Sequence, residues 1–326
     1  MDDHTYSSKN NLYSIIMFNT ISRFVHSRIT KFSTYAVRLA EDCRRQGGYS
    51  RAANYLTAIH SFTKAVGELP LNKISATVVE RYQTWMRTQG ICENTASCYN
   101  RSLRAIYNKA VAEGLVKDGK PFRDCYTGRM KTEKRSVNED CIRLLKNADL
   151  SHHEELKLTR DLFLFSFYTM GMPFVDIAYL KKSQINDTML VYRRHKTHQL
   201  VKVPLCKSAL HIINMHKDSS STYAFPILTH TQEPEAYKEY CTRLNAYNRS
   251  LKRLAKETGI NIALTSYTMR HSWASLAYKS GVPLPVISQA LGHTRPDTTM
   301  VYIRSLDNAQ MQEGNDKVQR LIGGQN

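Results

Sequence analysis

The chain has 326 residues and carries 46 lysines and arginines against 28 aspartates and glutamates, a formal net charge of +18. This length allows two domains with separate hydrophobic cores, and the positive charge predicts a polyanionic partner, above all nucleic acid. No apolar run reaches the ~18 residues of a membrane span, and two aspartates precede the apolar stretch near the N-terminus, so neither a membrane anchor nor a signal peptide is expected.

Cysteine usage favours a reducing cytoplasm. The seven cysteines are scattered along the chain, and none forms a Cys-x-x-Cys pair. The twelve histidines show no spacing typical of a structural metal site. We therefore expect free thiols, no bound metal and no cofactor.

The N-terminal part of the chain reads as an arm followed by a helical domain. Residues 1–30 form the expected arm, and apolar residues at helical spacing predict four helices within residues 31–118. Ser50, Ser75 and Asn94 are the expected N-caps of the second, third and fourth helices, because their side-chain oxygens can accept from backbone N–H groups.

The fourth of these helices has a polar face of possible functional interest. Five side chains that can donate hydrogen bonds fall close together at three- and four-residue steps. Such a face is ordinarily plain solvated surface, so by itself it identifies no site. Its members are Thr95, Ser97, Asn100, Arg101 and Arg104.

Residues 119–137 contain glycine, proline and clustered lysines and arginines, a composition typical of a basic interdomain linker. A second domain is expected over residues 138–306, beginning with a helix that opens at Asn138. Residues 307–326 form a C-terminal tail with apolar residues at near-helical spacing. The tail is either a frayed end or a segment that docks on a neighbouring subunit.

The segment MLVYRR alternates like a strand, HKTH suits a turn and QLVKVPL alternates again, which predicts a β-hairpin. Lys196 lies in this turn, two residues after Arg194. A lysine in a hairpin turn is usually just solvated, so its function has to be argued from other residues.

Three residues near the C-terminus have the strongest functional pattern. Arg270 is expected early in a helix that Thr265 or Ser266 caps and that ends at Lys279. Gly292 ends a second short helix, which leaves His293 just beyond it. A third helix beginning at Pro296 and Asp297 carries Tyr302 in its second turn.

These three residue types suit phosphoryl transfer. Arginine holds two phosphate oxygens in a planar fork and stays charged, histidine donates to an oxygen or moves a proton, and a tyrosine hydroxyl can attack phosphorus. Taken singly, an arginine is most often in a surface ion pair and a tyrosine in ordinary packing. The combination and order of Arg270, His293 and Tyr302 change that expectation.

The segments TSYTMRHSWAS and LGHTRPDTTMVYI resemble the C-terminal signature of the tyrosine recombinases, also called the phage integrase family. The resemblance extends over roughly residues 31–306. It implies a mainly α fold with a small β-sheet, in which an N-terminal helical core-binding (SAM-like) domain precedes a catalytic domain.

The resemblance also implies a mechanism without metal or ATP. Tyr302 would attack the scissile phosphate and form a 3′-phosphotyrosyl bond. Arg270 and His293 would stabilise the pentacoordinate phosphorus, and Lys196 would protonate the departing 5′ oxygen. Tyr267 replaces a usual histidine or lysine and would bind a phosphate oxygen or support the site, while Asp176 would orient other groups.

Implied partners are double-stranded DNA with paired recombination sites, three further copies of the chain in a homo-tetramer, and an accessory or directionality protein. The polar face of the fourth helix, defined above, would contact DNA together with Arg193 and Arg194. A cytoplasmic, nucleoid-associated location follows from such a substrate.

A second position, besides Tyr267, breaks the family pattern. Pro173 stands where the first catalytic arginine is expected, and proline has neither charge nor side-chain donor. The chain is then either an inactive copy of such an enzyme or an active enzyme in which another cation replaces the missing arginine. The candidates are Arg193, Arg194, Lys181 and Lys182. A bacterial subgroup rich in mobile-element and inversion enzymes has a similar Gly-Met-x-Phe-Val-Asp-x-Ala-x-Leu segment, which favours activity.

The predicted function is therefore a site-specific recombinase, an integrase or invertase acting on mobile elements or short repeats. Three alternatives remain open. They are a catalytically inactive sequence-specific DNA-binding relative, a type IB topoisomerase-like enzyme and a non-enzymatic basic chromosome or RNA-binding protein.

Overall fold

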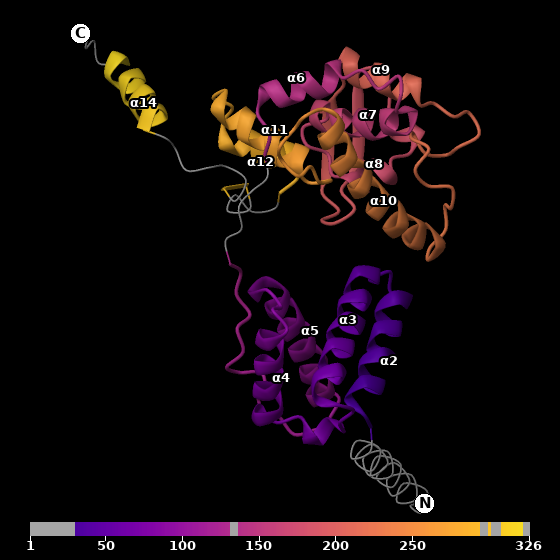
Figure 1. The fold of residues 1–326 in the computed structure, drawn as a ribbon, viewed down its shortest axis with the longest axis vertical. Coiled ribbons are helices and arrows are strands. Elements are labelled where there is room, and N and C mark those ends of the chain that lie inside the picture. Colours follow the sequence, from indigo (N-terminus) through magenta and orange to yellow (C-terminus); the bar gives the residue numbers. More distant parts are fainter. Residues whose placement is uncertain (1–29, 131–135, 294–298, 301–307, 322–326) are drawn as a thin grey trace, which may run out of the picture. The chain divides into compact units, whose positions relative to one another are not determined.

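Amphipathic helices build the first of two structural units, which spans residues 1–132 (Figure 1). The computed structural model describes residues 30–130, 136–293, 299–300 and 308–321. In the first unit, α3 contacts α2, α4 and α5. The aromatic rings of Phe32 and Tyr82 both meet Phe62 edge to face, with ring centroids 5.6 and 5.1 Å apart. The elements are α2 (Phe32–Arg45), α3 (Tyr49–Val66), η1 (Leu71–Lys73), α4 (Ala76–Thr88) and α5 (Glu93–Ala112).

The helix starts of this unit follow the sequence rules only in part. The Ser75 hydroxyl accepts from the Val78 N–H at 3.3 Å and caps α4, as predicted. The predicted caps Ser50 and Asn94 are wrong, because α3 and α5 begin before them. The Asn94 amide instead exchanges two hydrogen bonds with the backbone of Met130, at 2.9 and 3.2 Å.

The chain after α5 also departs from the expected free linker. Phe122 is buried and packs edge to face on Tyr107, with ring centroids 6.1 Å apart. The carbonyls of Tyr126 and Gly128 accept from side chains of α5. The segment from about residue 119 to residue 130 therefore belongs to the first unit, because burying an aromatic ring outweighs the polar composition that suggested a linker.

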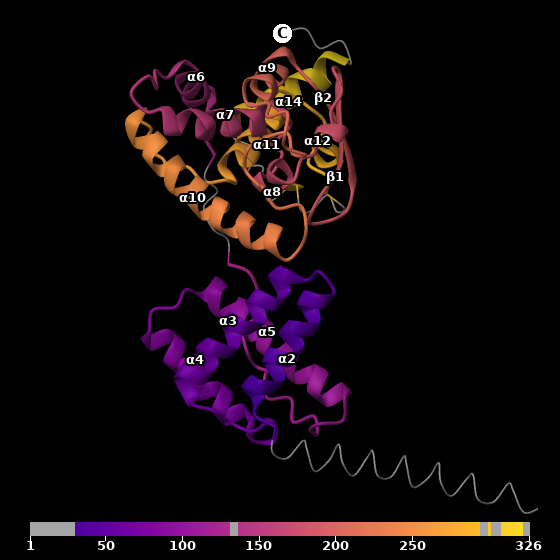
Figure 2. The same ribbon diagram turned by 90° about the vertical axis from the view of Figure 1, so that its right-hand side faces the viewer.

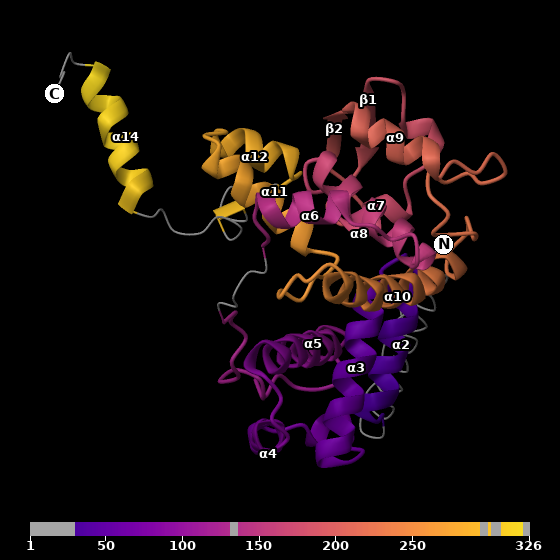
Figure 3. The same cartoon turned by 45° about the horizontal axis from the view of Figure 1, so that its top comes forward.

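The second unit, residues 133–326, holds the remaining elements. Its described residues form a main hydrophobic core and a smaller separate cluster of Ala274, Ile287 and Leu291. Its central helix is α7, which contacts α6, α9, α10 and α11 (Figure 3). The elements are α6 (Glu139–Asn147), α7 (Glu154–Tyr168), α8 (Phe174–Ala178), η2 (Lys182–Gln184), β1 (Met189–Arg193), β2 (Leu200–Pro204), α9 (Lys207–Met215), α10 (Glu235–Glu257), α11 (Thr268–Lys279), α12 (Leu284–Ala290) and α14 (Asn308–Leu321).

Strands β1 and β2 form the predicted antiparallel hairpin, with Met189 opposite Pro204 and Arg193 opposite Leu200 (Figure 2). The hairpin packs through β2 against α12. Along β1, Leu190 and Tyr192 are buried while Arg193 is exposed, which is the period-two alternation of a strand with one covered face. The hairpin therefore brings the residues that follow β1 to the end of α12.

Helix boundaries in the second unit mostly follow local rules. Asn138 caps α6 by accepting from the Cys141 N–H at 3.1 Å, as predicted. Helix α11 ends at Lys279 as predicted, but it begins after Tyr267, so the expected Thr265 or Ser266 cap is wrong. The Ser266 N–H donates to the Asn248 side chain of α10 at 2.9 Å. This bond holds the turn against α10, and α11 begins two residues later, at Thr268. The predicted helix start at Pro296 and Asp297 lies outside the described residues.

Candidate active site

Arg270 lies in the first turn of α11 with only 2% of its surface exposed. Its Nη1 donates to the Gly171 carbonyl at 2.9 Å, and its Nη2 donates to the Leu291 carbonyl at 2.6 Å. Gly171 has a φ of +74°, and a Cβ there would lie 3.0 Å from Arg270 Cα, so both the backbone conformation and the close approach favour glycine. Arg270 thus joins the turn after α7 to the end of α12.

His293 follows α12 and meets Arg270 directly. Its Nε2 lies 3.0 Å from Arg270 Nη2, and its Nδ1 lies 2.8 Å from Thr299 Oγ1. Because a guanidinium can only donate, Nε2 is the acceptor and the proton resides on Nδ1, which donates to Thr299. Burial lowers the pKa of His293 to about 4, with further lowering by the positive charges of Arg270, Arg194 and Lys196. The imidazole is therefore neutral near pH 7.

Arg194 adds a second buried guanidinium to the site. It follows β1 directly and is only 4% exposed. Its Nη1 donates to the Leu291 carbonyl at 2.7 Å, the oxygen that also accepts from Arg270, so the two guanidinium groups lie side by side. Its Nε donates to Asp176 Oδ2 at 3.3 Å.

Asp176, on α8, is the acidic group of this cluster. Its Oδ1 accepts from the His195 N–H at 2.8 Å, so the carboxylate holds both the hairpin turn and Arg194. Burial raises the pKa of Asp176, although hydrogen bonds from His195 and Arg194 and the nearby Arg270 act in the opposite direction. One buried carboxyl therefore faces two buried arginines, and the excess positive charge suits an anion with several oxygens, such as a phosphate.

The other predicted site residues of the second unit that the structure describes are exposed to solvent. Lys196 is exposed in the hairpin turn, close enough for its charge to lower the pKa of His293. Arg193 is exposed and donates to the His198 carbonyl at 3.3 Å. Tyr267 precedes α11 with 42% of its surface exposed and its ring centroid 6.1 Å from that of His271. Tyr302 lies outside the described residues.

The polar face of α5 differs from the expected surface. Ser97 and Asn100 are fully buried, because their side chains donate to the carbonyls of Gly128 and Tyr126 at 2.6 and 3.0 Å. Their predicted availability to DNA is therefore wrong. Thr95, Arg101 and Arg104 are partly exposed, and a DNA contact by these three stays a prediction.

Sequence reasoning missed the parts of the site that the backbone supplies. The Leu291 carbonyl links both arginines, and no side-chain pattern reports it. Arg194 was predicted as a DNA contact and also as one of four candidates to replace the missing first arginine, and the structure buries it beside Arg270. Strand alternation places Arg194 on the face of Tyr192, but the structure is needed to show that this face is the buried one.

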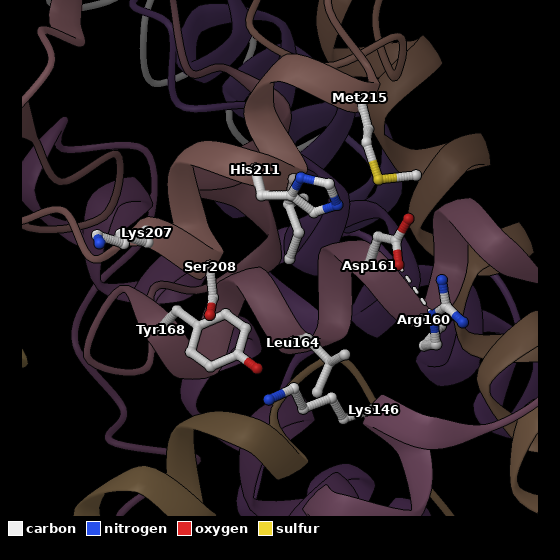
Figure 4. Close-up of a pocket in the computed structure, with 10 residues that line it drawn as sticks. Lys146, Arg160, Asp161, Leu164, Tyr168, Lys207, Ser208, His211 and Met215 are labelled. Carbon is white, nitrogen blue, oxygen red and sulfur yellow. Dashed lines mark hydrogen bonds and ion pairs between the residues drawn. The ribbon is translucent and has the colours of Figure 1, made fainter.

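A separate pocket of about 410 Å³ lies beside α7 and α9 and shares no residue with this site (Figure 4). Lys146 and Lys207 line it, together with Arg160 and Asp161, which form an ion pair at 2.9 Å. His216 lies 2.8 Å from the other oxygen of Asp161, so the acid is already paired. We assign this pocket no chemistry.

In the described ranges, no group of three or more histidine, cysteine, aspartate or glutamate side chains is arranged to hold a metal ion. No helix among those same residues is both long and apolar enough to cross a bilayer.

The state of His293 gives a pH prediction. Its folded pKa, about 4, lies below the ordinary value of about 6.5, so the unfolded chain takes up the proton first. The stability that comes from burying the neutral imidazole of His293 is therefore fully present above pH ~6.5. The free energy of unfolding decreases as the pH falls from ~6.5 toward ~4. In an NMR titration, the imidazole signal that disappears in His293→Gln should not move between pH ~7.5 and ~5.5. A midpoint close to 6.5 would contradict this environment.

Two known protein families match this chain, one in each of its two structural units. The sequence pattern of the Phage integrase family matches residues 135–309, and that of the Phage integrase SAM-like domain matches residues 31–127. Tyrosine recombinase XerD of Listeria monocytogenes is 24% identical over 271 residues, which cover 78% of this chain and 85% of the relative. Tyrosine recombinase XerC of Alcanivorax borkumensis is 23% identical over 290 residues, covering 85% and 90%.

Solved structures share the fold. A lambda integrase dimer bound to a COC' core site has a TM-score of 0.64 at 16% identity, covering 84% of this chain and 95% of that one. The Tn1549 transposon integrase in complex with a circular intermediate DNA has a TM-score of 0.61 at 12% identity, covering 88% and 99%. The predicted fold class, a helical SAM-like domain followed by a mainly α catalytic domain with a small sheet, is confirmed.

Proposed function

The chain belongs to the phage integrase family, the tyrosine recombinases, and on that premise we propose that the cluster around Arg270 is the centre at which it cleaves and rejoins DNA. The protein is a site-specific recombinase. One observation carries the assignment of the centre. Inside the matched region, Arg270 and Arg194 share the Leu291 carbonyl, His293 bonds to Arg270, and the buried carboxylate of Asp176 bonds to Arg194.

The proposed reaction begins with the scissile phosphate bound by the Arg270 guanidinium. The Tyr302 hydroxyl attacks phosphorus and its proton leaves to Nε2 of neutral His293, the ring nitrogen that accepts a hydrogen bond in this structure. The bond from phosphorus to the 5′ oxygen breaks, and Lys196 gives that oxygen a proton. The charge that develops on the pentacoordinate phosphorus is stabilised by the arginines.

The second half of the reaction reverses the first. A 5′ hydroxyl of a partner strand attacks the 3′-phosphotyrosyl bond, Lys196 accepts its proton, and the Tyr302 oxygen leaves with the proton returned by His293. The phosphotyrosyl ester conserves the energy of the broken bond, so strand exchange needs no ATP. Asp176 acts by orienting Arg194 and the hairpin rather than by moving a proton.

The proposed substrate is double-stranded DNA with paired recombination sites, held by a homo-tetramer and directed by an accessory or directionality protein. The net charge of +18 supports a polyanionic substrate. Integration or inversion of mobile elements or short repeats is the proposed biological role. The protein would work in the cytoplasm, associated with the nucleoid.

The experiment that tests this function is a covalent trap with Tyr302→Phe as the matched variant. Nicked suicide duplexes made from repeats flanking the gene are incubated with each protein in EDTA, and denaturing gels are scanned for protein-linked DNA. The wild type should form the adduct without metal. The variant should form none and should keep its DNA affinity within about threefold, because one hydroxyl among many phosphate contacts contributes little to binding.

The alternatives give different outcomes in this assay. Sequence-specific binding without any adduct would identify an inactive relative. An adduct accompanied by relaxation of supercoils by a monomer, with no need for paired sites, would identify a topoisomerase-like enzyme. Formation of the adduct by Tyr302→Phe would show that another residue is the nucleophile.

A further inference from the structure

We infer that Arg194 is the second phosphate-binding arginine of this active site, a role that rests on the proposed function. The turn that contains Gly171 offers no such group, because Pro173 has no side-chain donor. Arg194 comes from a different element, the end of β1, and reaches the site through the hairpin.

The geometry singles out Arg194 among the nearby cations. Arg193 is exposed and donates to its own turn at His198. Lys181 is exposed, and Lys182 donates to the Asp218 carbonyl. Of these four side chains, all of them in the described chain, Arg194 is the one that is buried and shares an acceptor with Arg270.

The surrounding residues fix the Arg194 side chain in place. Asp176 holds its Nε and the Leu291 carbonyl holds its Nη1. Its aliphatic part crosses Gly292, where an added Cβ would lie 2.5 Å from Arg194 Cδ. Gly292 therefore makes room for Arg194 as Gly171 does for Arg270, and each arginine has a glycine against its stem.

Nη2, the remaining terminal nitrogen of Arg194, is the atom that would bind the phosphate. Nη2 of Arg194 donates no hydrogen bond to any residue in the described ranges, while Nε and Nη1 are both engaged. A guanidinium held at two nitrogens beside a second guanidinium is preorganised to bind an oxyanion with the third. The like charges of Arg194 and Arg270 repel when the site is empty, and a bound phosphate relieves that repulsion.

The test compares Arg194→Ala with Arg143→Ala, which removes an exposed arginine of α6 that is paired with Asp140, on two nicked duplexes. One carries the normal scissile phosphate and the other a neutral methylphosphonate at that position. On the phosphate, Arg194→Ala should form the adduct about 10²–10³-fold more slowly than wild type. Arg143→Ala should stay within about threefold of wild type, because an exposed ion pair contributes little.

The neutral substrate separates a catalytic role from a structural one. If Arg194 neutralises the phosphate, the methylphosphonate should bring Arg194→Ala to within about tenfold of wild type on the same substrate, because the charge that Arg194 opposes has been removed. Arg194→Lys keeps the charge beside Asp176 and should show a smaller defect with the same relief. A defect of equal size on both substrates, in both variants, would overturn the assignment.

The same assay separates this inference from the proposed function. An adduct formed equally well by wild type and Arg194→Ala would overturn the role of Arg194 and leave the recombinase assignment intact. No adduct from the wild type on either substrate would overturn the proposed function, and the role of Arg194 with it.

Discussion

Replacing Arg270 by alanine should reduce the rate of covalent adduct formation by at least about 10³-fold. The loss of a single transition-state donor typically costs 10²–10³-fold, and Arg270 supplies both a charge and a two-nitrogen fork. The variant also removes the Arg270 donor from the Gly171 carbonyl and leaves the Leu291 carbonyl with Arg194 alone, so the positions of Arg194 and His293 should relax. DNA affinity should fall less than tenfold, because many other phosphates are contacted. Single-turnover adduct formation and gel-shift titration measure the two effects.

Two variants control for the charge and for the fold. Arg270→Lys keeps a positive charge but loses the fork, and its rate should lie between those of wild type and alanine. Arg143→Ala removes an arginine that is exposed on α6 and paired with Asp140, and it should behave as wild type. An Arg270→Ala rate within tenfold of wild type would remove Arg270 from the mechanism.

Gly292→Ala should damage both stability and activity. The residue has a φ of +62°, a conformation that costs a non-glycine residue about 1–2 kcal/mol. Its new Cβ would also lie 2.5 Å from Arg194 Cδ and 3.0 Å from Val201 Cγ2, so Arg194 must move. We expect a loss of about 2 kcal/mol in the free energy of unfolding and a loss of about 10²-fold in adduct formation. Chemical denaturation and the covalent trap measure these effects.

Gly281→Ala is the matched control for this variant. Gly281 has a φ of +80°, but a Cβ there would meet nothing within 4 Å. It should therefore show the backbone cost alone, with a lower free energy of unfolding and an adduct rate close to wild type. Equal activities of the two variants would show that contact between residue 292 and Arg194 does not matter for the reaction.

Local sequence rules predicted those features whose cause is local. Ser75 and Asn138 cap their helices, and alternation with a turn identified the hairpin. The same rules failed where a distant segment supplies the hydrogen bond. Asn94 bonds to Met130 instead of capping α5, and Asn248 holds the turn before α11. Such contacts depend on packing between segments, which no short sequence window contains.

The candidate active site likewise contains some features that the local sequence predicts and others that depend on distant segments. Spacing and family resemblance predicted Arg270 and His293 as members of one site, and the structure places Arg270 Nη2 3.0 Å from His293 Nε2. The hairpin sequence alone does not tell whether Arg193 or Arg194 is the buried arginine, because that depends on which face of the strand α12 covers. The roles of Lys196, Tyr267 and Tyr302 stay predictions.

The most direct measurement for this account is to identify the residue that becomes linked to DNA. The adduct from a nicked duplex is digested with nuclease and protease, and the modified peptide is sequenced by mass spectrometry. We predict a nucleotide attached through phosphate to Tyr302, with the 3′ end of the cleaved strand in the linkage. A nucleotide on another residue, such as Tyr267 or Tyr278, or a linkage through the 5′ end, would contradict the proposed mechanism.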